Sequence, residues 1–156
     1  MRHITTIAAI ALGLALATPA PPTVAMQTAQ RAYCTQTAGS VYSSGGHDFC
    51  EYANEHDGSR IVIALRTLYD EKPSLAALLY VLKPSPAGHC HGNPSSCYCA
   101  QLGGTGTAVT IAGQAIEMCF FADGSAIDAW GLTYHANGVV RGVDLTRVMR
   151  YKYDGR

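Results

Sequence analysis

The chain has 156 residues, of which 48% are hydrophobic and 14% charged, and its 11 basic and 11 acidic residues give a formal net charge of zero. A nucleic-acid-binding protein usually carries a basic excess or a basic stripe, so this charge balance argues against that class. Six cysteines, 16 glycines and 7 prolines indicate a compact, turn-rich chain rather than a long helical or disordered one. The length allows one ordinary domain or two very small ones.

Residues 1–25 are predicted to be an export signal. Arg2 precedes the apolar run Ile7–Ala17, which is too short to span a bilayer comfortably, and small residues precede Met26 at the expected cleavage site. We therefore expect a mature chain that starts near Met26 and is periplasmic or secreted. A retained N-terminal membrane anchor is the alternative. No later apolar run is long enough to cross a membrane, so we expect no stable membrane span after signal removal.

Two parts of the mature chain repeat the same pattern of residues. The similarity lies in three blocks of sequence that each occur twice. In the first block Tyr, Cys, Gln and Gly recur at matching positions. In the second an aromatic residue follows a cysteine by two places, and the third begins with Asp-Gly-Ser. The matched blocks are 32–39 with 97–104, 48–52 with 117–121, and 57–61 with 123–127. Because the blocks keep their order, we predict an α+β fold of two pseudo-repeated units, each a short helix followed by a three-stranded antiparallel meander.

The first, more degenerate unit is predicted to occupy residues 26–82. Its expected elements, in chain order, are a helix near 28–38, strands near 41–43, 47–52 and 60–68, and an apolar helix over 73–82 that packs between the two units. Residues 83–96 are predicted to be a connector rich in proline and glycine, which stiffens the link to the second unit.

The second unit is predicted to occupy residues 93–138. Asn93 with Pro94 is typical of a helix start and Gly103 of a helix end, which predicts a helix over 95–102. The expected strands span 107–111, 115–121 and 127–134. Residues 139–156 form a basic tail, which is predicted to dock on the core as a terminal strand or helix.

All six cysteines lie in the mature part of an exported chain, which predicts three disulfides. Six cysteines allow about 15 pairings. The repeat places equivalent cysteines on the helix and on the second strand of each unit, and this symmetry favours one pairing. The predicted disulfides join Cys34 with Cys50, Cys99 with Cys119, and Cys90 with Cys97. Each would stabilise the fold by about 2–4 kcal/mol, mainly by restricting the unfolded chain.

Three segments, 93–104, 118–125 and 128–130, together resemble the short bacterial domain of unknown function 333. Proteins with this domain are often labelled hemolysins, and the resemblance implies an exported bacterial protein. It covers residues 93–138, and the first unit is a more degenerate version of the same pattern. The family's further pair of cysteines is missing, since Ile127 stands at the first of those positions and no cysteine follows Cys119.

His89, Cys90 and His91 are the strongest chemical cluster in the sequence. A thiol with flanking imidazoles is a suitable ligand set for copper or zinc. In an oxidising compartment, however, we expect the cysteine to form a disulfide, and two histidines that alternate on an extended chain point to opposite sides. We therefore expect an exposed loop closed by a disulfide, with no metal and no other cofactor. If the protein does bind a metal, His89 and His91 are the candidate ligands.

Trp130 is the only tryptophan and is expected on a strand in the core, with a ligand-stacking platform as the alternative. The candidate binding residues are His89, His91, Asn93 and Trp130. The sequence contains no nucleophile elbow, no zinc-protease helix motif and no phosphate-binding glycine loop. We therefore expect no enzyme and no catalytic residue.

These observations predict an exported, disulfide-stabilised binding module that recognises a protein or a cell-envelope component. One concrete form is an inhibitor-like scaffold that presents the loop His89–Ser96 with little loss of conformational entropy. The alternatives are a periplasmic metal-binding protein that uses His89 and His91, and a membrane-active, hemolysin-like protein.

Overall fold

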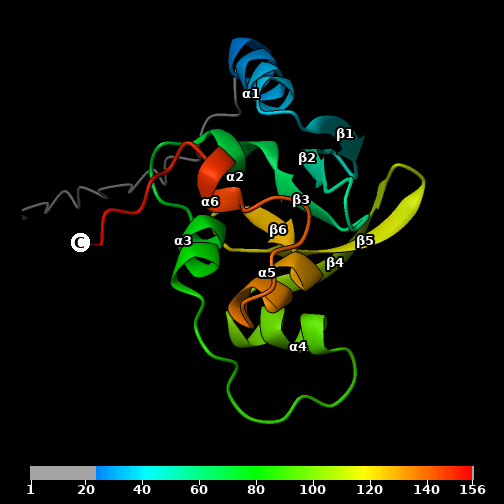
Figure 1. Ribbon diagram of the computed structural model, residues 1–156, viewed down its shortest axis with the longest axis vertical. Coiled ribbons are helices and arrows are strands. Elements are labelled where there is room, and N and C mark those ends of the chain that lie inside the picture. The colour runs from blue at the N-terminus through cyan, green and yellow to red at the C-terminus, as the bar shows by residue number, and fades with distance from the viewer. Residues whose placement is uncertain (1–23, 156) are drawn as a thin grey trace, which may run out of the picture.

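The computed structural model describes residues 24–155 and shows a six-stranded sheet with helices packed against it (Figure 1). The fold is therefore α+β, as predicted. In chain order the elements are α1 Val24–Gln36, β1 Ser40–Ser44, β2 His47–Ala53, β3 Arg60–Ala64, α2 Leu65–Tyr69, α3 Leu75–Leu82, α4 Pro94–Gln101, β4 Thr105–Ile111, β5 Gln114–Phe120, β6 Ala126–Asp128, α5 Ala129–Ala136 and α6 Leu145–Val148. The predicted export signal lies outside the described residues, except that its last two residues already belong to α1.

Strands β3 and β6 join two antiparallel meanders at the centre of the sheet. The strand order is β1-β2-β3-β6-β5-β4, and β3 pairs with β6 in antiparallel fashion through Ile63 and Ile127. Each meander is formed by three strands that are consecutive in the chain. The two meanders therefore form one continuous sheet.

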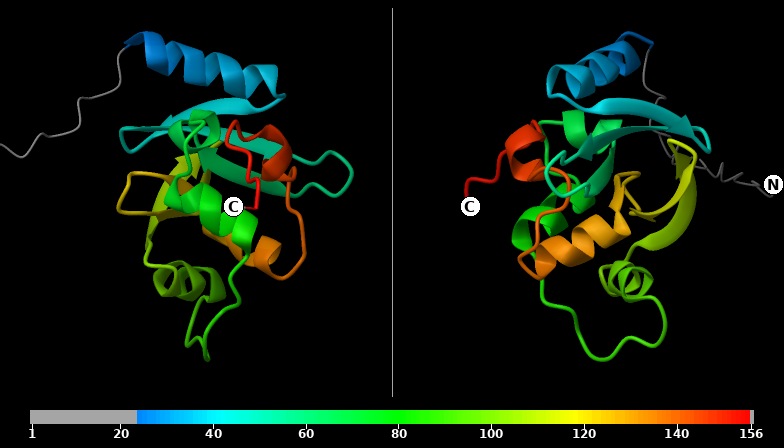
Figure 2. Two further views of the ribbon diagram at one scale, coloured as in Figure 1. Left: turned by 90° about the vertical axis from the view of Figure 1, so that its left-hand side faces the viewer. Right: turned by 45° about the vertical axis from the view of Figure 1, so that its right-hand side comes forward.

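The larger core lies on the face of the sheet that the helices cover (Figure 2). Successive side chains of a strand point to opposite faces, so Ile61 and Ile63 of β3 enter this core whereas Val62 does not. Buried side chains from α1 to α5 and from the start of α6 complete it. Because both halves of the chain contribute to this core, they pack as one body.

A second, smaller core lies on the other face, where the sheet curls on itself. The amide nitrogen of Thr110 in β4 donates to Oγ of Ser44 in β1 at 3.0 Å, so the two edge strands meet. The curl encloses Phe49, Val62 and Met118, all of which are fully buried. Contact between the edge strands also leaves less open strand edge than a flat sheet would.

Two disulfides occupy corresponding places in the two halves. Cys34–Cys50 joins α1 to β2, and Cys99–Cys119 joins α4 to β5. In each half a glycine follows the helix and passes directly over the sulfur atoms: a Cβ on Gly39 would clash with Sγ of Cys50. The chain therefore needs glycine at this point, and the same contact recurs in the second half.

The corresponding glycine of the second half is Gly104. Its amide nitrogen donates to the carbonyl oxygen of Cys99 at 2.9 Å, as that of Gly39 donates to Cys34 at 2.8 Å. A Cβ on Gly104 would clash with Sγ of Cys119. The two halves thus share the order helix, three strands, helix and the contacts that fix the first helix to the sheet.

The predicted third strand of each unit is wrong in its second part. The strand expected over 60–68 ends at Ala64 and continues as α2, and the strand expected over 127–134 ends at Asp128 and continues as α5. The buried residues Ala129, Leu132 and Thr133 have helical spacing, which the alternation of apolar residues concealed. The Asp128 side chain caps α5 by accepting a hydrogen bond from the Gly131 amide at 3.0 Å.

The apolar segment after the first unit forms α3, and the C-terminal segment docks beside it. Ala76, Ala77 and Tyr80 of α3 are buried, and this helix packs against α2 and α5. Leu145 and Met149, at the two ends of α6, are also fully buried. No helix among residues 24–155 is both long enough and apolar enough to cross a membrane.

Candidate binding site

Strand β5 extends beyond the end of its neighbour β6, and a recess opens there. β5 pairs with β6 only from Met118 to Phe120, whereas it pairs with β4 along its whole length down to Gln114. Past Asp128 the chain leaves the sheet to form α5. The resulting recess has a volume of about 320 Å³, and the residues that shape it include Asn93, Ala115, Glu117, Asp128, Trp130 and Arg141.

Two aromatic side chains and an arginine line one wall of the recess and the surface beside it. The ring centroids of Trp130 and Tyr134, one turn apart on α5, lie 5.6 Å from each other. The guanidinium carbon of Arg141 lies 5.1 Å from the centroid of the Tyr134 ring. Tyr134 is 38% exposed and Trp130 is half-buried. The prediction that Trp130 lies on a strand in the core is therefore wrong, and its ring contributes to an accessible surface.

Arg141 is bound to the protein by few polar contacts. Its Nε atom is buried and has no hydrogen-bond partner among the described residues. Within residues 24–155 it forms no ion pair either, although the charge of Asp128 is close enough to interact with it. Arg141 thus lines the recess without an ion-pair partner within the described residues.

Asp128 is a buried acid at the floor of the recess. The residue is 6% exposed, and burial raises the pKa of its carboxyl group from 3.8 to about 6, against the opposing effects of the Gly131 amide and of Arg141. Its carboxyl group therefore changes charge in the mildly acidic range.

Glu117 connects the recess to the start of α4. Its carboxylate accepts hydrogen bonds from Asn93 Nδ2 at 3.2 Å, from Ser95 Oγ at 2.9 Å and from Ser96 Oγ. Asn93 also caps α4, because its Oδ1 accepts from the Ser95 amide at 3.0 Å. These bonds fix the wall opposite α5 and leave Glu117 little capacity for a ligand.

A corresponding recess of about 510 Å³ lies in the first half of the molecule. The register fixes the correspondence: Cys50 pairs with Ile63 as Cys119 pairs with Ile127. Ala64 therefore occupies the place of Asp128, and Arg66 occupies the place of Trp130. Both residues line the first recess, together with Asp48 in the place of Glu117.

The two recesses differ in chemistry although they agree in architecture. Arg66 forms an ion pair with Asp70 one turn along α2, with Nε to Oδ2 at 3.4 Å, where α5 has the aromatic pair. Asp48 is occupied by an ion pair with Arg31 at 2.5 Å. The acid, the tryptophan and the unpaired arginine thus occur together only in the recess beside β5.

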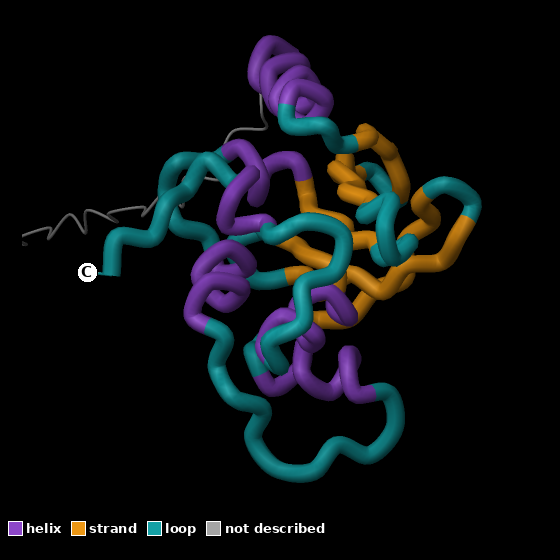
Figure 3. The backbone as a smooth tube through the Cα atoms, in the orientation of Figure 1, coloured by secondary structure: helices purple, strands orange, loops and turns teal. Residues whose placement is uncertain are grey.

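The structure separates the predicted histidine candidates from this site. His89 and His91 are exposed on the long loop that joins α3 to α4 and that swings away from the body of the molecule (Figure 3). Cys90, between them, forms a disulfide with Cys97 and so offers no thiolate to a metal. Among residues 24–155 no group of three or more His, Cys, Asp or Glu side chains is arranged to hold a metal ion.

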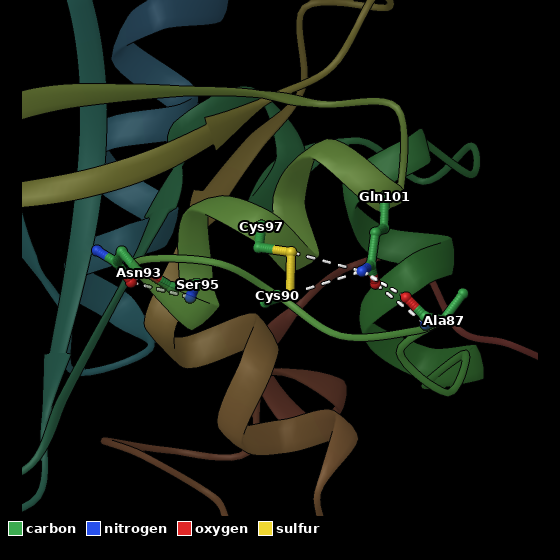
Figure 4. The surroundings of a disulfide bond; sticks show 6 residues. All are labelled: Ala87, Cys90, Asn93, Ser95, Cys97 and Gln101. Atoms are coloured by element: carbon green, nitrogen blue, oxygen red, sulfur yellow. Dashed lines mark hydrogen bonds between the residues drawn. A yellow bond between two sulfur atoms is a disulfide. The ribbon is translucent and has the colours of Figure 1, made fainter.

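The disulfide and one glutamine hold that loop against α4 (Figure 4). Gln101 Nε2 donates to the carbonyl oxygen of Ala87 at 2.6 Å, and the Ala87 amide donates to Gln101 Oε1 at 3.1 Å. The same Nε2 lies 3.6 Å from Sγ of Cys90 and 3.5 Å from Sγ of Cys97. The loop is therefore fixed at its α4 end, close to Asn93.

Of the predicted binding residues, Asn93 and Trp130 meet in the recess. Sequence reasoning missed Glu117, Asp128 and Arg141. In the sequence Glu117 and Asp128 look like ordinary acidic residues of a predicted strand. Nothing near Arg141 distinguishes it from the other basic residues of the C-terminal part. Their common location follows from the register of β5 with β6, which the sequence does not show.

Residues 91–135 match the model of a protein family described as a domain of unknown function (DUF333). The matched segment runs from the loop before α4 almost to the end of α5, and it contains every residue named above for the recess beside β5 except Arg141. The resemblance to this family is therefore confirmed for the second half of the chain. No curated protein and no solved structure matches the chain.

Proposed function

We propose that this protein is an exported binding module that recognises a protein or cell-envelope component through the recess beside β5. The difference between the two recesses carries the proposal. Where the first half places Ala64 and an Arg66–Asp70 ion pair, the second half places a buried acid and the pair Trp130 and Tyr134. Asp128 also caps α5, but the first half forms the same architecture without an aromatic pair, so the fold does not require Trp130 and Tyr134, and this supports a role for them in ligand binding.

The side chains at the recess are of the types that dominate binding energy. Residues that lose most affinity on truncation are enriched in tryptophan, tyrosine and arginine. Trp130, Tyr134 and Arg141 supply one of each on a continuous surface. A buried acid with a raised pKa in a cleft is also typical of functional sites.

The disulfides support both the rigidity of the module and its place of action. A preformed site loses little conformational entropy when a ligand binds, and Cys90–Cys97 and Cys99–Cys119 both hold α4, whose capping residue Asn93 lines the recess. Disulfides persist in oxidising compartments, which supports a periplasmic or secreted location.

A second candidate function uses the loop between α3 and α4 instead. The loop protrudes from the body of the molecule, and the Cys90–Cys97 disulfide with Gln101 restrains it (Figures 1 and 4). A restrained, exposed loop is what an inhibitor-like scaffold presents. In this form the contact residues are those of His89–Ser96.

Capture from an envelope fraction tests both candidates. The processed protein, immobilised, is compared with Trp130→Ala and with Arg66→Ala, which changes the corresponding position of the first recess. We expect Trp130→Ala to retain less than about a tenth of the captured component, in keeping with a hot spot of 2 kcal/mol or more, and Arg66→Ala to capture as much as the wild type.

Thermal unfolding of each variant separates a lost contact from a lost fold. Equal capture by Trp130→Ala and Arg66→Ala, with both variants folded, would contradict the proposal that the ligand binds in the recess beside β5. A loss confined to a variant with His89→Ala and His91→Ala would instead identify the loop as the contact surface.

A further inference from the structure

The recess exposes a length of unpaired strand edge, and this edge indicates the kind of ligand. From Gln114 to Glu117, strand β5 pairs with β4 on one side, and no strand among the described residues pairs with it on the other. An open edge offers main-chain donors and acceptors that an extended peptide can use by adding as a further strand. The corresponding edge of β2 is shorter, because β2 pairs with β3 up to Phe49 and begins only two residues earlier.

The space beside this edge suits an extended chain. Gln114 and Ala115 are exposed, and Ile116 and Glu117 are half-buried. Ala115 lines the recess and has a short side chain. The opposite wall is formed by Trp130, at a distance set by the departure of α5 from the sheet. A peptide placed here would pair with β5 on one side and pack its side chains against the indole ring.

Arg141 is the group at the recess that an acidic side chain would bind, since the two acids there are already engaged within the protein. Glu117 already accepts three hydrogen bonds, and Asp128 caps α5 and is largely buried. Arg141 lines the recess and forms no ion pair within the described residues. A carboxylate on the ligand would pair with its guanidinium group through a charge-assisted hydrogen bond.

We propose that the recess binds an extended peptide segment, which pairs with the main chain of residues 114–117 and places an acidic side chain on Arg141 beside Trp130. This inference rests on the proposed function, because it names the ligand class of the same recess. Main-chain pairing supplies affinity, and the acidic side chain supplies specificity.

Nuclear magnetic resonance titration of the isotope-labelled, processed protein tests the proposal. The probe is a pool of acetylated and amidated pentapeptides with Thr at both ends, Asp at the centre, and Val, Ile, Thr or Tyr between. We expect the amide signals of Ala115, Ile116 and Glu117 and the indole signal of Trp130 to shift. Replacing the central Asp by Asn is expected to weaken binding about tenfold, which is the effect of losing one charge-assisted hydrogen bond.

Three controls make the result specific. N-methylation of the peptide amides removes main-chain donors and is expected to abolish the shifts of residues 115–117. Arg141→Gln is expected to reduce the preference for Asp over Asn to within about twofold, because the charge that selects Asp is gone. Arg66→Gln, at the corresponding position of the first recess, is expected to keep the tenfold preference.

The proposal fails if the pool shifts none of these signals at millimolar concentration, or if N-methylated peptides bind equally well. It also fails if Arg141→Gln keeps the full preference for Asp. A shift of the Trp130 indole by chitotetraose but not by the peptides would identify a saccharide site instead. If the peptides fail while Trp130→Ala still abolishes capture from the envelope fraction, the proposed function stands and only the peptide inference is wrong.

Discussion

A single position shows how the second recess departs from the first. Asp128 and Ala64 occupy corresponding places, and only Asp128 places a carboxyl group in the interior. The folded state prefers the protonated acid, since burial raises its pKa above the unfolded value. The stability that protonation gives is fully present below pH 3.8 and is lost as the pH rises through about 6.

We therefore predict that Asp128→Asn stabilises the protein at neutral pH. Asparagine caps a helix about as well as aspartate, so the variant keeps the cap on α5 and loses only the buried charge. From a shift of 3.8 to about 6, the gain above pH 7 is about 2–3 kcal/mol at most. Urea unfolding at several pH values measures it. A variant that is less stable than the wild type at pH 7, or equally pH-dependent, would contradict this account of Asp128.

His135 is predicted to make the protein less stable in acid, the opposite of the effect of Asp128. It is 2% exposed, its ring stacks on Tyr80 with centroids 3.7 Å apart, and neither ring nitrogen has a hydrogen-bond partner among the described residues. Burial lowers its pKa from 6.5 to about 4, Lys83 adds to this effect, and Asp144 opposes it. The folded state thus prefers the neutral ring, and its contribution to stability is present above pH 6.5 and is lost as the pH falls toward 4.

Replacement of His135 by phenylalanine should flatten the loss of stability in acid. Phenylalanine keeps a flat ring against Tyr80 but cannot take up a proton. Unfolding midpoints in urea at pH 7 and pH 5 are expected to differ less in His135→Phe than in the wild type. An equal difference in both proteins would show that another group is responsible.

At the scale of elements, the sequence predicted most of what is local. The helix at α4 with its Asn93 cap, the hairpins of both meanders and the helix α3 follow from capping residues, turn residues and periodicity. The disulfide pairs in the structure are those that the internal similarity favours. All these features depend on residues close in sequence or on a pattern that occurs twice.

The register and the ends of the strands could not be predicted in the same way. The matched blocks align Ile61 with Ile127. In the structure Ile63 is the residue that corresponds to Ile127, because each lies opposite the strand cysteine of its own half, and the two isoleucines also pair with each other. The shift arises because the hairpin between β2 and β3 is longer than the one between β5 and β6. The run from Ile127 to Tyr134 fits both a strand and a helix, and tertiary packing with the Asp128 cap decides for a helix. The recess depends on both of these features, so the set of residues that line it could not be predicted from the sequence.

The glycine that follows each first helix is predicted to be essential for stability. A Cβ on Gly104 would clash with Sγ of Cys119 and approach Sγ of Cys99 to 2.9 Å. Since neither the disulfide nor the helix end can move freely, Gly104→Ala is expected to cost about 1–3 kcal/mol of unfolding free energy. Urea unfolding of Gly104→Ala and of its counterpart Gly39→Ala measures this cost. Wild-type stability in both would mean that the close approach is relieved without penalty.

In the molecule as a whole, the Cys90–Cys97 disulfide limits metal binding by the loop that joins α3 to α4. With Cys90 bonded to Cys97, His89 and His91 stand on an exposed loop without a third ligand nearby in the described part of the chain. We therefore predict that neither copper nor zinc changes the native mass or the melting temperature of the oxidised protein. A stoichiometric adduct that is lost in His89→Ala with His91→Ala would contradict this and would revive the metal-binding alternative.

The overall shape of the sheet also determines where the proposed ligand would bind. The sheet is curled, its edges β1 and β4 touch, and the helices cover the other face, so the recess beside β5 is one of the places where strand edge and aromatic surface are both accessible. We propose that recognition takes place at this recess.

The emission of Trp130 tests that claim most directly, because this residue is the only tryptophan in the chain. Purified captured component is titrated into the wild type, Arg141→Gln and Arg66→Gln. We predict a saturable change in tryptophan emission for the wild type and for Arg66→Gln, and a midpoint at a higher concentration of the component for Arg141→Gln. Binding that is complete by mass while the emission of Trp130 stays constant would contradict recognition at this recess.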